Sequence, residues 1–155
     1  MDDSELDPVH VVTKFGIAAK SKQEAIESVS EAIFNQGYLT DLADFQRDVF
    51  EREQEVPTYI GHGIGLPHAK SVFVKNAVVG IGKLVAPVDW DKNKEADLVF
   101  MIAVPAKKGE NLHLQILAKV SRLLMHETFR NNLRNSNELE VKRLMISNFD
   151  TPKRK

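Results

Sequence analysis

Apolar residues that recur every three or four positions predict two helices in the first third of the chain. The first helix begins at a capping box, in which Ser21 accepts a backbone N–H and Glu24 reaches back toward the preceding backbone. Gly37 supplies the left-handed residue that ends it. The second helix begins at Thr40 or Asp41 and is amphipathic as far as Pro57. Each of these helices therefore has one face to bury.

The same spacing predicts two further helices near the end of the chain. The longer one runs from about Glu110 to His126, and the shorter one covers about residues 138 to 147, with Asn137 and Glu140 as its expected cap. The longer helix has an apolar stripe made of Leu112, Ile116, Leu117, Val120, Leu123 and Leu124.

Three runs in the middle of the chain have no helical period and favour strands: residues 56–60, 77–85 and 97–104. The last run is almost wholly apolar, as expected of a strand that is covered on both faces. Residues 61–68 contain three glycines and a proline and are expected to form an irregular loop. Residues 87–96 link the last two strands. Buried strands mixed with amphipathic helices predict a layered α/β domain, in a strand order that the pattern does not give.

Composition narrows the class of protein. The chain has 155 residues, 43% of them hydrophobic, which is the size of one domain. The formal net charge of −1 excludes a global field that would favour nucleic acid or a membrane surface. Cysteine is absent, so a disulfide framework, a thiol nucleophile and a thiolate metal site are excluded. We expect an ordered core over about residues 10–150 with loose termini, and a cytoplasmic protein without a signal peptide or membrane span.

Two of the five histidines have ordinary structural interpretations. His10 lies close to the N-terminus, where we expect a solvated side chain. His126 lies at the expected end of the long helix, where a cation complements the helix dipole.

His68 closes the glycine-rich segment 61–68. Glycines let backbone N–H groups approach an anion closely, and Pro67 fixes the direction from which the chain enters His68. This arrangement suits an imidazole that is presented beside a phosphate-binding nest. The alternative is a tight turn with an incidental histidine.

His113 and Arg52 are the other candidates. His113 lies in the first turns of the long helix, at the rim of its buried face and near the positive end of the helix, where an anion is favoured. The alternative is a core histidine whose hydrogen bonds are satisfied. Arg52 has a planar fork that can grip phosphate, although an arginine at the end of an acidic helix is often a surface ion-pair member.

Several motif readings fail. Residues 65–71 are not a nucleotide phosphate loop. That motif requires glycine immediately before Lys70 and again five residues earlier, and those positions are Ala69 and Ile64. No HExxH motif is present, nor a dinucleotide GxGxxG after a strand. A metal site of His62, His68 and His113 is arithmetically possible, but the first two flank a proline and glycines and do not share a helical face.

Three segments together resemble a known family. They are residues 51–53 (ERE), 57–68 (PTYIGHGIGLPH) and 111–124 (NLHLQILAKVSRLL). They are similar to the signature blocks of enzyme IIA of the fructose–mannitol type (type 2) in the bacterial phosphoenolpyruvate-dependent sugar phosphotransferase system, or PTS. The resemblance covers about residues 13–148. One departure is His62, since the family often has glutamate or asparagine there.

The resemblance implies a fold and a site. The fold is a mixed, about five-stranded sheet with helices on both faces, and the site lies at one sheet edge. His68 is implied as the phosphorylated residue, His113 as its active-site partner and Arg52 as the arginine that stabilises phosphate. The implied phosphate-binding or rim residues are Gly61, His62, Gly63 and Glu53. His62 has two open interpretations, a phosphate contact or a simply exposed residue.

The resemblance also implies a function and partners. The chain would be a phosphotransferase that accepts phosphate from phospho-HPr and passes it to a cysteine of enzyme IIB, for sugar uptake. It would need no metal or other cofactor, bind no nucleic acid, and meet the membrane component IIC only through IIB. We expect a single free-standing domain, residues 1–155, so that IIB is a separate chain. The alternative is a regulatory, nitrogen-type IIA that acts by binding other proteins.

The acidic helix suggests where a donor docks. Residues 41–55 carry six acidic and two basic side chains, which could face a basic patch on the donor protein.

Overall fold

The computed structural model describes residues 9–108 and 110–149. Its elements, in chain order, are β1 (His10–Ile17), α1 (Lys22–Asn35), α2 (Leu42–Glu55), β2 (Ile64–Gly65), β3 (His68–Ser71), β4 (Val78–Asp91), β5 (Lys94–Pro105), the 3-10 turn η2 (Ala106–Lys108), α3 (Glu110–Leu124), α4 (Glu127–Asn135) and α5 (Glu138–Phe149).

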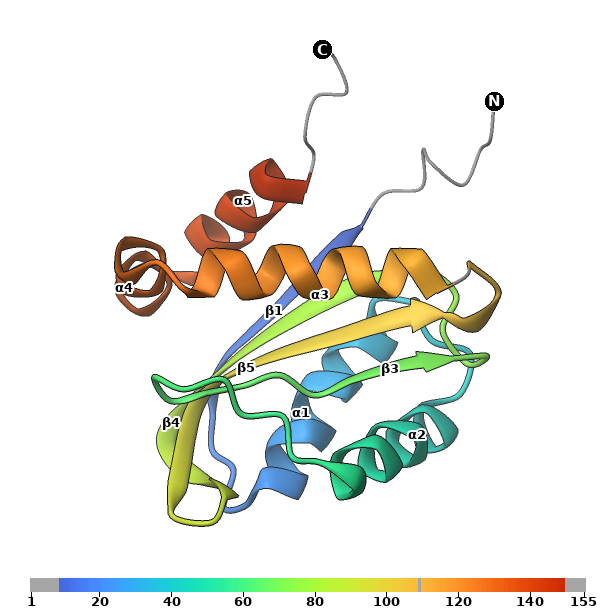
Figure 1. Cartoon of the computed structure of the whole chain (residues 1–155), viewed down its shortest axis with the longest axis horizontal. Helices are drawn as coiled ribbons and strands as arrows, with labels where there is room; N and C mark the ends of the chain where they lie inside the picture. Colours follow the sequence, from blue (N-terminus) through green and yellow to red (C-terminus); the bar gives the residue numbers. More distant parts are fainter. Residues whose placement is uncertain (1–8, 109, 150–155) are drawn as a thin grey trace.

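The strands form one mixed sheet of five strands in the order β1-β4-β5-β2, with β3 also paired to β5 (Figure 1). β4 and β5 are antiparallel, whereas β1 runs parallel to β4, and both β2 and β3 run parallel to β5. The expectation of a mixed five-stranded α/β fold is confirmed.

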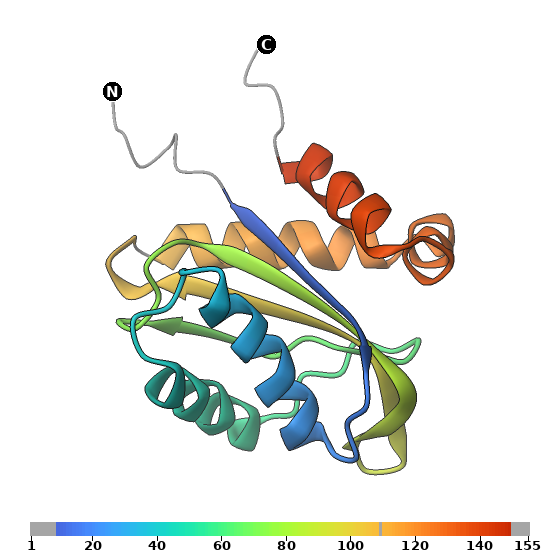
Figure 2. The same ribbon diagram turned by 180° about the vertical axis from the view of Figure 1, so that it is seen from behind.

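Helices cover both faces of this sheet. α1 and α2 lie on one face (Figure 2), and α3 lies across the other, with α4 and α5 continuing around it (Figure 1). Each face has its own core. The first contains Val29 of α1 and Phe45 of α2, and the second contains Val120 of α3, Leu133 of α4 and Met145 of α5. A central sheet buried on both sides explains why β5 is almost wholly apolar.

The helix caps largely agree with the sequence. Ser21 Oγ accepts from the N–H of Glu24 at 3.1 Å, although the Glu24 carboxylate accepts from the N–H of Lys20, not from that of Ser21. The Asn137–Glu140 capping box is reciprocal, with distances of 2.9 and 2.8 Å. These caps satisfy N–H groups that have no partner within the helix, which fixes where α1 and α5 begin.

Several strand predictions were wrong. β1 was not predicted, because its buried residues do not alternate with exposed ones. Residues 56–60 form no strand, and only Tyr59 makes an isolated bridge, to Gly65. Residues 87–96 are not a separate linker: β4 and β5 continue through most of them and form a hairpin, in which Val88 and Trp90 are buried and Asp89 is exposed. That two-residue alternation was the signal for a strand.

The two peripheral histidines also differ from expectation. His126 does not end the long helix, since α3 ends at Leu124 and His126 is the residue before α4. α4 was missed because it buries only two side chains, Phe129 and Leu133. His10 is half-buried, and its ring stacks on that of Tyr38 with 4.5 Å between centroids.

The outer edge of the sheet at β1 is met by the first residue of α5. The Glu138 carboxylate accepts hydrogen bonds from the backbone N–H of Phe15, at 2.9 Å, and from the hydroxyl of Thr13, at 3.2 Å. Among the described residues, no helix is both long enough and apolar enough to span a membrane.

Candidate functional site

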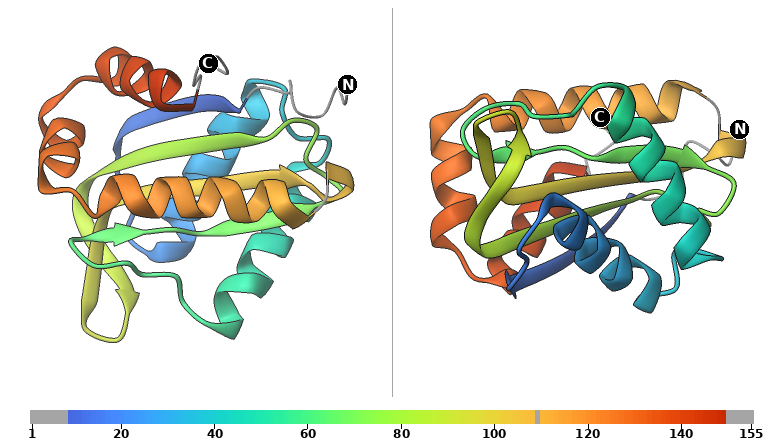
Figure 3. Two further views of the ribbon diagram at one scale, coloured as in Figure 1. Left: turned by 45° about the horizontal axis from the view of Figure 1, so that its top comes forward. Right: turned by 90° about the horizontal axis from the view of Figure 1, so that it is seen from below.

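The site is built at the edge of the sheet that β3 forms. His68 pairs with Ile102 of β5, which belongs to the core on the α3 face, and Ala69 pairs with Ala103, which belongs to the core on the opposite face. Because paired residues of adjacent strands share a face, His68 is on the α3 side of the sheet. At an edge strand, helices from both faces can reach the same point. In Figure 3, β3 runs between α2 and α3.

A cavity of about 530 Å³ lies at this edge and contains the three principal predicted residues. Arg52 reaches it from α2, His68 from β3 and His113 from α3. Residues separated by up to 65 positions in the sequence (48 to 113) therefore line one surface. The complete lining is Asp48, Glu51, Arg52, Glu55, His68, Ala69, Lys70, Ser71, Val72, Phe73, Ala106 and His113.

The ring of His68 has a defined tautomer. Its side chain is buried, and Nδ1 lies 2.9 Å from the backbone oxygen of Leu66. A carbonyl oxygen only accepts hydrogen bonds, so Nδ1 carries the proton and Nε2 keeps its lone pair. Burial lowers the pKa of His68, and the charge of Arg52 also lowers it, whereas the Leu66 hydrogen bond and Glu53 raise it. The net lowering favours a neutral, nucleophilic imidazole.

His113 faces His68 across the cavity. Their ring centroids are 5.2 Å apart, and the rings are tilted by 41°. Nε2 of His113 is buried and has no hydrogen-bond partner among the described residues. Burial lowers the pKa of His113 most, and electrostatic interactions with His68, Lys70 and Arg52 lower it further. An unpaired buried nitrogen is costly, so it fits a group that completes its hydrogen bonds when a ligand arrives.

Arg52 lies in the last turn of α2, where Nη1 donates to the backbone oxygen of Val56 at 3.1 Å. Its fork is thus held by its own helix end while it lines the cavity. Its positive charge lowers the pKa of both His68 and His113, although Lys70 lowers the pKa of His113 more than Arg52 does.

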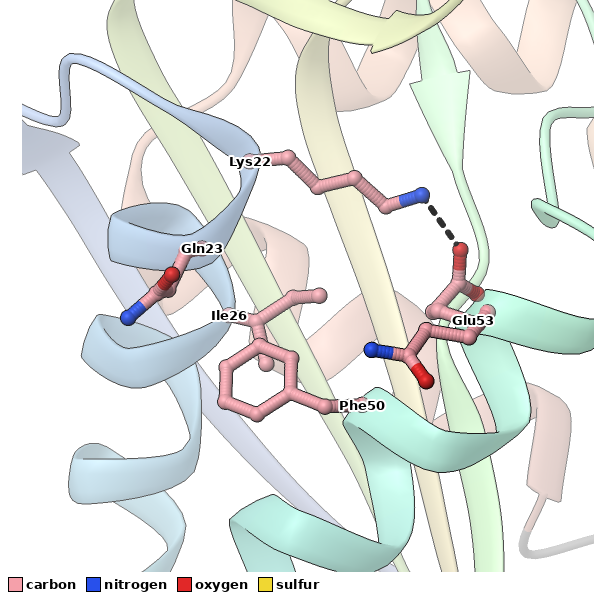
Figure 4. Close-up of a pocket in the computed structure, with 6 residues that line it drawn as sticks. Lys22, Gln23, Ile26, Phe50 and Glu53 are labelled. Atoms are coloured by element: carbon pink, nitrogen blue, oxygen red, sulfur yellow. Dashed lines mark ion pairs between the residues drawn. The ribbon is translucent and has the colours of Figure 1, made fainter.

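Glu53 does not line this cavity. It is buried and faces the groove between α1 and α2 shown in Figure 4, where its Oε1 lies 2.7 Å from Nζ of Lys22. The adjacent residue Arg52 lines the cavity instead, because successive residues of a helix point in directions about 100° apart.

Gly61, His62 and Gly63 do not line the cavity either. His62 is exposed and borders a separate depression with Ile60, Ser121, Leu124 and Met125. Its backbone adopts a positive φ of 57°, and its carbonyl oxygen accepts from Arg134 at 2.6 Å. This loop meets β5 near Leu98, four residues before the position opposite His68. Among the described residues, no three histidine, aspartate or glutamate side chains are grouped to hold a metal ion.

Two residues that affect the charge of the cavity, Lys70 and Asp48, were not predicted from the sequence. Lys70 lies two positions after His68 in β3, so both are on the same face. The signal was present, but the segment was interpreted as a loop that ends at His68. Asp48 was missed as a site residue; its carboxylate accepts from the buried Ser71 hydroxyl at 2.6 Å, which ties α2 to β3.

Comparison with known proteins identifies the family. Residues 9–148 match the family model described as phosphoenolpyruvate-dependent sugar phosphotransferase system, EIIA 2. The chain belongs to this PTS EIIA family. It is 41% identical over 115 residues to a fructose-specific EIIA component of Haloferax volcanii, covering 73% of this chain and 74% of that protein. It spans only 14% of a longer relative, the multiphosphoryl transfer protein of Escherichia coli.

Solved structures share the fold. The nitrogen regulatory protein IIA-Ntr of Neisseria meningitidis superposes with a TM-score of 0.76 at 24% identity, over 93% of this chain and 98% of that one. Enzyme IIAMTL of Escherichia coli, in its complex with phosphorylated enzyme IIBMTL, superposes with a TM-score of 0.71 at 25% identity, over 86% and 92% of the chains. The predicted family is confirmed: this is a phosphoryl-carrier family of the PTS, of the fructose–mannitol type.

Proposed function

We propose that this chain accepts a phosphoryl group from phospho-HPr on Nε2 of His68 and passes it to a cysteine of enzyme IIB. The observation that carries the proposal is the geometry of His68. Its Nδ1 is tied to a backbone oxygen, and its ring lines a cavity with a fixed arginine and a second histidine. In this proposal residues 1–155 contribute a single EIIA domain that works in the cytoplasm and needs no cofactor.

The transfer step follows from the tautomer. The lone pair of His68 Nε2 attacks the phosphorus atom of the donor's phosphohistidine and forms a new P–N bond. The donor's P–N bond breaks, and its electron pair returns to the donor imidazole. In the next step the cysteine thiolate of IIB attacks, and His68 recovers its lone pair. The transition state is loose, so the protein contributes positioning and electrostatic stabilisation.

Arg52 and His113 stabilise the transferred group in this mechanism. The guanidinium of Arg52 binds the equatorial oxygens, which carry the negative charge of the transition state. Nε2 of His113, which has no partner in the described residues, donates to a phosphoryl oxygen when it carries a proton. Lys70 adds a flexible positive charge at the mouth of the cavity, where its side chain is exposed.

The acidic end of α2 provides the docking surface in this proposal. Asp48, Glu51 and Glu55 line the cavity beside Arg52, so a partner must approach past three carboxylates. Such a rim favours a partner whose phosphorylated residue is surrounded by basic side chains. Asp48 is already engaged by Ser71. Charge reversal is therefore best made at the exposed residues Glu51 and Glu55, where we expect slower transfer from the donor and a weaker dependence of its rate on salt.

Phosphorylation with phosphoenolpyruvate, enzyme I and HPr tests the proposal. We expect one acid-labile, base-stable phosphoryl group, which His68→Ala abolishes. His62→Ala is the matched control and should accept phosphate at the normal rate, because His62 borders a separate depression. His113→Ala should still accept phosphate but transfer it more slowly. A His68→Ala chain that still forms the adduct would refute the assignment.

The regulatory alternative is separated by the acceptor. The similarity to a fructose-specific EIIA component favours transport, whereas the likeness to the nitrogen regulatory protein is one of fold. Mixing the phosphorylated chain with a fructose-type IIB should move the phosphoryl group to the IIB cysteine. Retention of the group on His68 would favour the regulatory function.

A further inference from the structure

Glu53 was expected at the rim of the phosphate cavity, yet its carboxylate is turned into the interior on the other side of α2 (Figure 4). It is 5% exposed. A buried carboxylate is costly unless each oxygen is paired. Here the pairing groups come from two separate segments, and one of them is linked by further hydrogen bonds to His68.

The first partner is Lys22 at the start of α1. Its ammonium lies 2.7 Å from Glu53 Oε1 and also donates to the backbone oxygen of Trp90 at 3.2 Å. The same ammonium lies 4.9 Å from the centre of the Trp90 ring. Lys22 therefore neutralises Glu53 and is itself held by β4, so the position of the carboxylate is fixed by α1 and the sheet together.

The second partner is Thr58, in the segment between α2 and β2. Its backbone N–H donates to Glu53 Oε1 at 3.1 Å, and its hydroxyl donates to Oε2. Both oxygens of Glu53 are thus engaged by one residue. Because Thr58 is bound through its backbone as well as its side chain, Glu53 sets the position of the peptide at this point.

Thr58 is hydrogen-bonded to Leu66, the residue whose carbonyl oxygen binds the His68 ring. The carbonyl oxygen of Thr58 accepts from the N–H of Leu66 at 2.9 Å and from the indole N–H of Trp90 at 3.0 Å. The carbonyl oxygen of Leu66 accepts in turn from Nδ1 of His68 at 2.9 Å. An unbroken series of hydrogen bonds therefore runs from Lys22 through Glu53, Thr58 and Leu66 to the ring.

We propose that Glu53 is a positioning residue for His68, which acts through Thr58 and the Leu66 backbone to keep the His68 ring in its Nδ1–H tautomer, with Lys22 holding Glu53 in place. The inference rests on the proposed function only where it concerns the rate of phosphoryl transfer, because the tautomer of His68 can be measured in the absence of a phosphoryl donor. It assigns Glu53 no contact with phosphate. Outer partners of this kind fix the orientation of a reactive histidine without touching its substrate.

The test uses the full chain labelled with ¹⁵N, in which the shifts of the two ring nitrogens report the tautomer of His68. In the native chain we expect Nδ1 protonated and Nε2 unprotonated above the pKa of His68. In Glu53→Gln and Thr58→Val we expect both shifts to move toward a mixture of tautomers. Thr58→Ser keeps the hydroxyl and should restore the native shifts. Glu31→Gln removes an exposed acid from α1 and should change nothing.

A second readout separates the hydrogen-bond series from the charge alone. The negative charge of Glu53 raises the pKa of His68, so Glu53→Gln should lower it, whereas Thr58→Val keeps the charge and should alter mainly the tautomer. We expect phosphate acceptance to slow about tenfold in Glu53→Gln, the lower end of the loss typical for outer-shell partners. If that variant does not fold, the comparison of Thr58→Val with Thr58→Ser decides the question.

Native ring shifts in both Glu53→Gln and Thr58→Val would overturn the inference. Equal shifts in Thr58→Val and Thr58→Ser would also overturn it, since the hydroxyl would then not be the link. Failure of the proposed function looks different: His68 would not be phosphorylated in the native chain, while the ring shifts would still respond to these variants.

Discussion

Gly65→Ala is predicted to destabilise the chain through one collision. Gly65 lies against Trp90, and a Cβ atom built on it would be 2.4 Å from Cε2 and 2.5 Å from Cζ2 of the indole. Ordinary contact begins at 3.4 Å, so the ring must move by about 1 Å. Gly65 is not among the glycines with positive φ, which means that alanine brings no backbone strain of its own.

The ring has little freedom to move. Trp90 is 3% exposed, and its indole N–H donates to the Thr58 carbonyl oxygen at 3.0 Å. Overpacking of a buried site costs about 1–3 kcal/mol. Loss of one neutral hydrogen bond adds about 1 kcal/mol. We therefore expect Gly65→Ala to lower the free energy of unfolding by about 2–4 kcal/mol.

Urea unfolding followed by circular dichroism measures this loss, and a double-mutant cycle tests its cause. In a Trp90→Leu background the collision is absent, so Gly65→Ala should cost less than about 1 kcal/mol there. The reasoning is refuted if Gly65→Ala costs the same in both backgrounds, because the loss would then have another origin.

Three further predictions concern charge. Burial lowers the folded-state pKa of His68 and His113. The stability that their neutral forms contribute is therefore complete above the ordinary pKa of about 6.5 and is lost as the pH falls from there through the lower folded-state pKa values. Urea midpoints should fall over the same pH range, and they should fall less steeply in a chain with glutamine at both positions. Lys22→Met should destabilise the chain by about 3 kcal/mol, the low end for breaking a buried ion pair, because Thr58 still binds Glu53. Calorimetry should show that adding Glu53→Gln to this variant restores part of the lost stability. Arg52→Lys should slow phosphate acceptance about 100-fold and leave the unfolding midpoint unchanged, since a lysine cannot reproduce the planar fork of arginine. Equal rates of phosphate acceptance by the native and variant chains in rapid-quench experiments would contradict the role of Arg52.

The sequence predicted the helices well, because an amphipathic stripe and a cap are local features. α1, α2, α3 and α5 are recognisable in this way, and the Ser21 cap of α1 and the capping box of α5 mark their first residues. β1 and α4 are both peripheral and were both missed: the buried residues of β1 do not alternate with exposed ones, and α4 buries only two side chains. The partner that completes their packing comes from a distant part of the chain.

The candidate site shows the same division. His68, His113 and Arg52 were identified by residue type and by resemblance, and they line one cavity. Glu53 was expected at the phosphate-binding rim, but it lines the groove between α1 and α2, because adjacency to Arg52 in sequence says nothing of which way a helical residue points. Lys70 was overlooked because the start of β3 is set by pairing with β5, which the glycines and proline before it obscure.

The carboxylate of Glu138 has a consequence for how the two edges of the sheet behave. An exposed edge strand is a template on which another chain can add a strand and aggregate. At β1 the outward N–H of Phe15 is already taken by Glu138, and a charged group stands where a foreign strand would pair. The opposite edge, at β3, carries His68, and in the proposed function a partner approaches the molecule there. The fold thus discourages strand addition at the β1 edge and leaves the β3 edge accessible, which suits the proposed carrier function, in which each partner must be released.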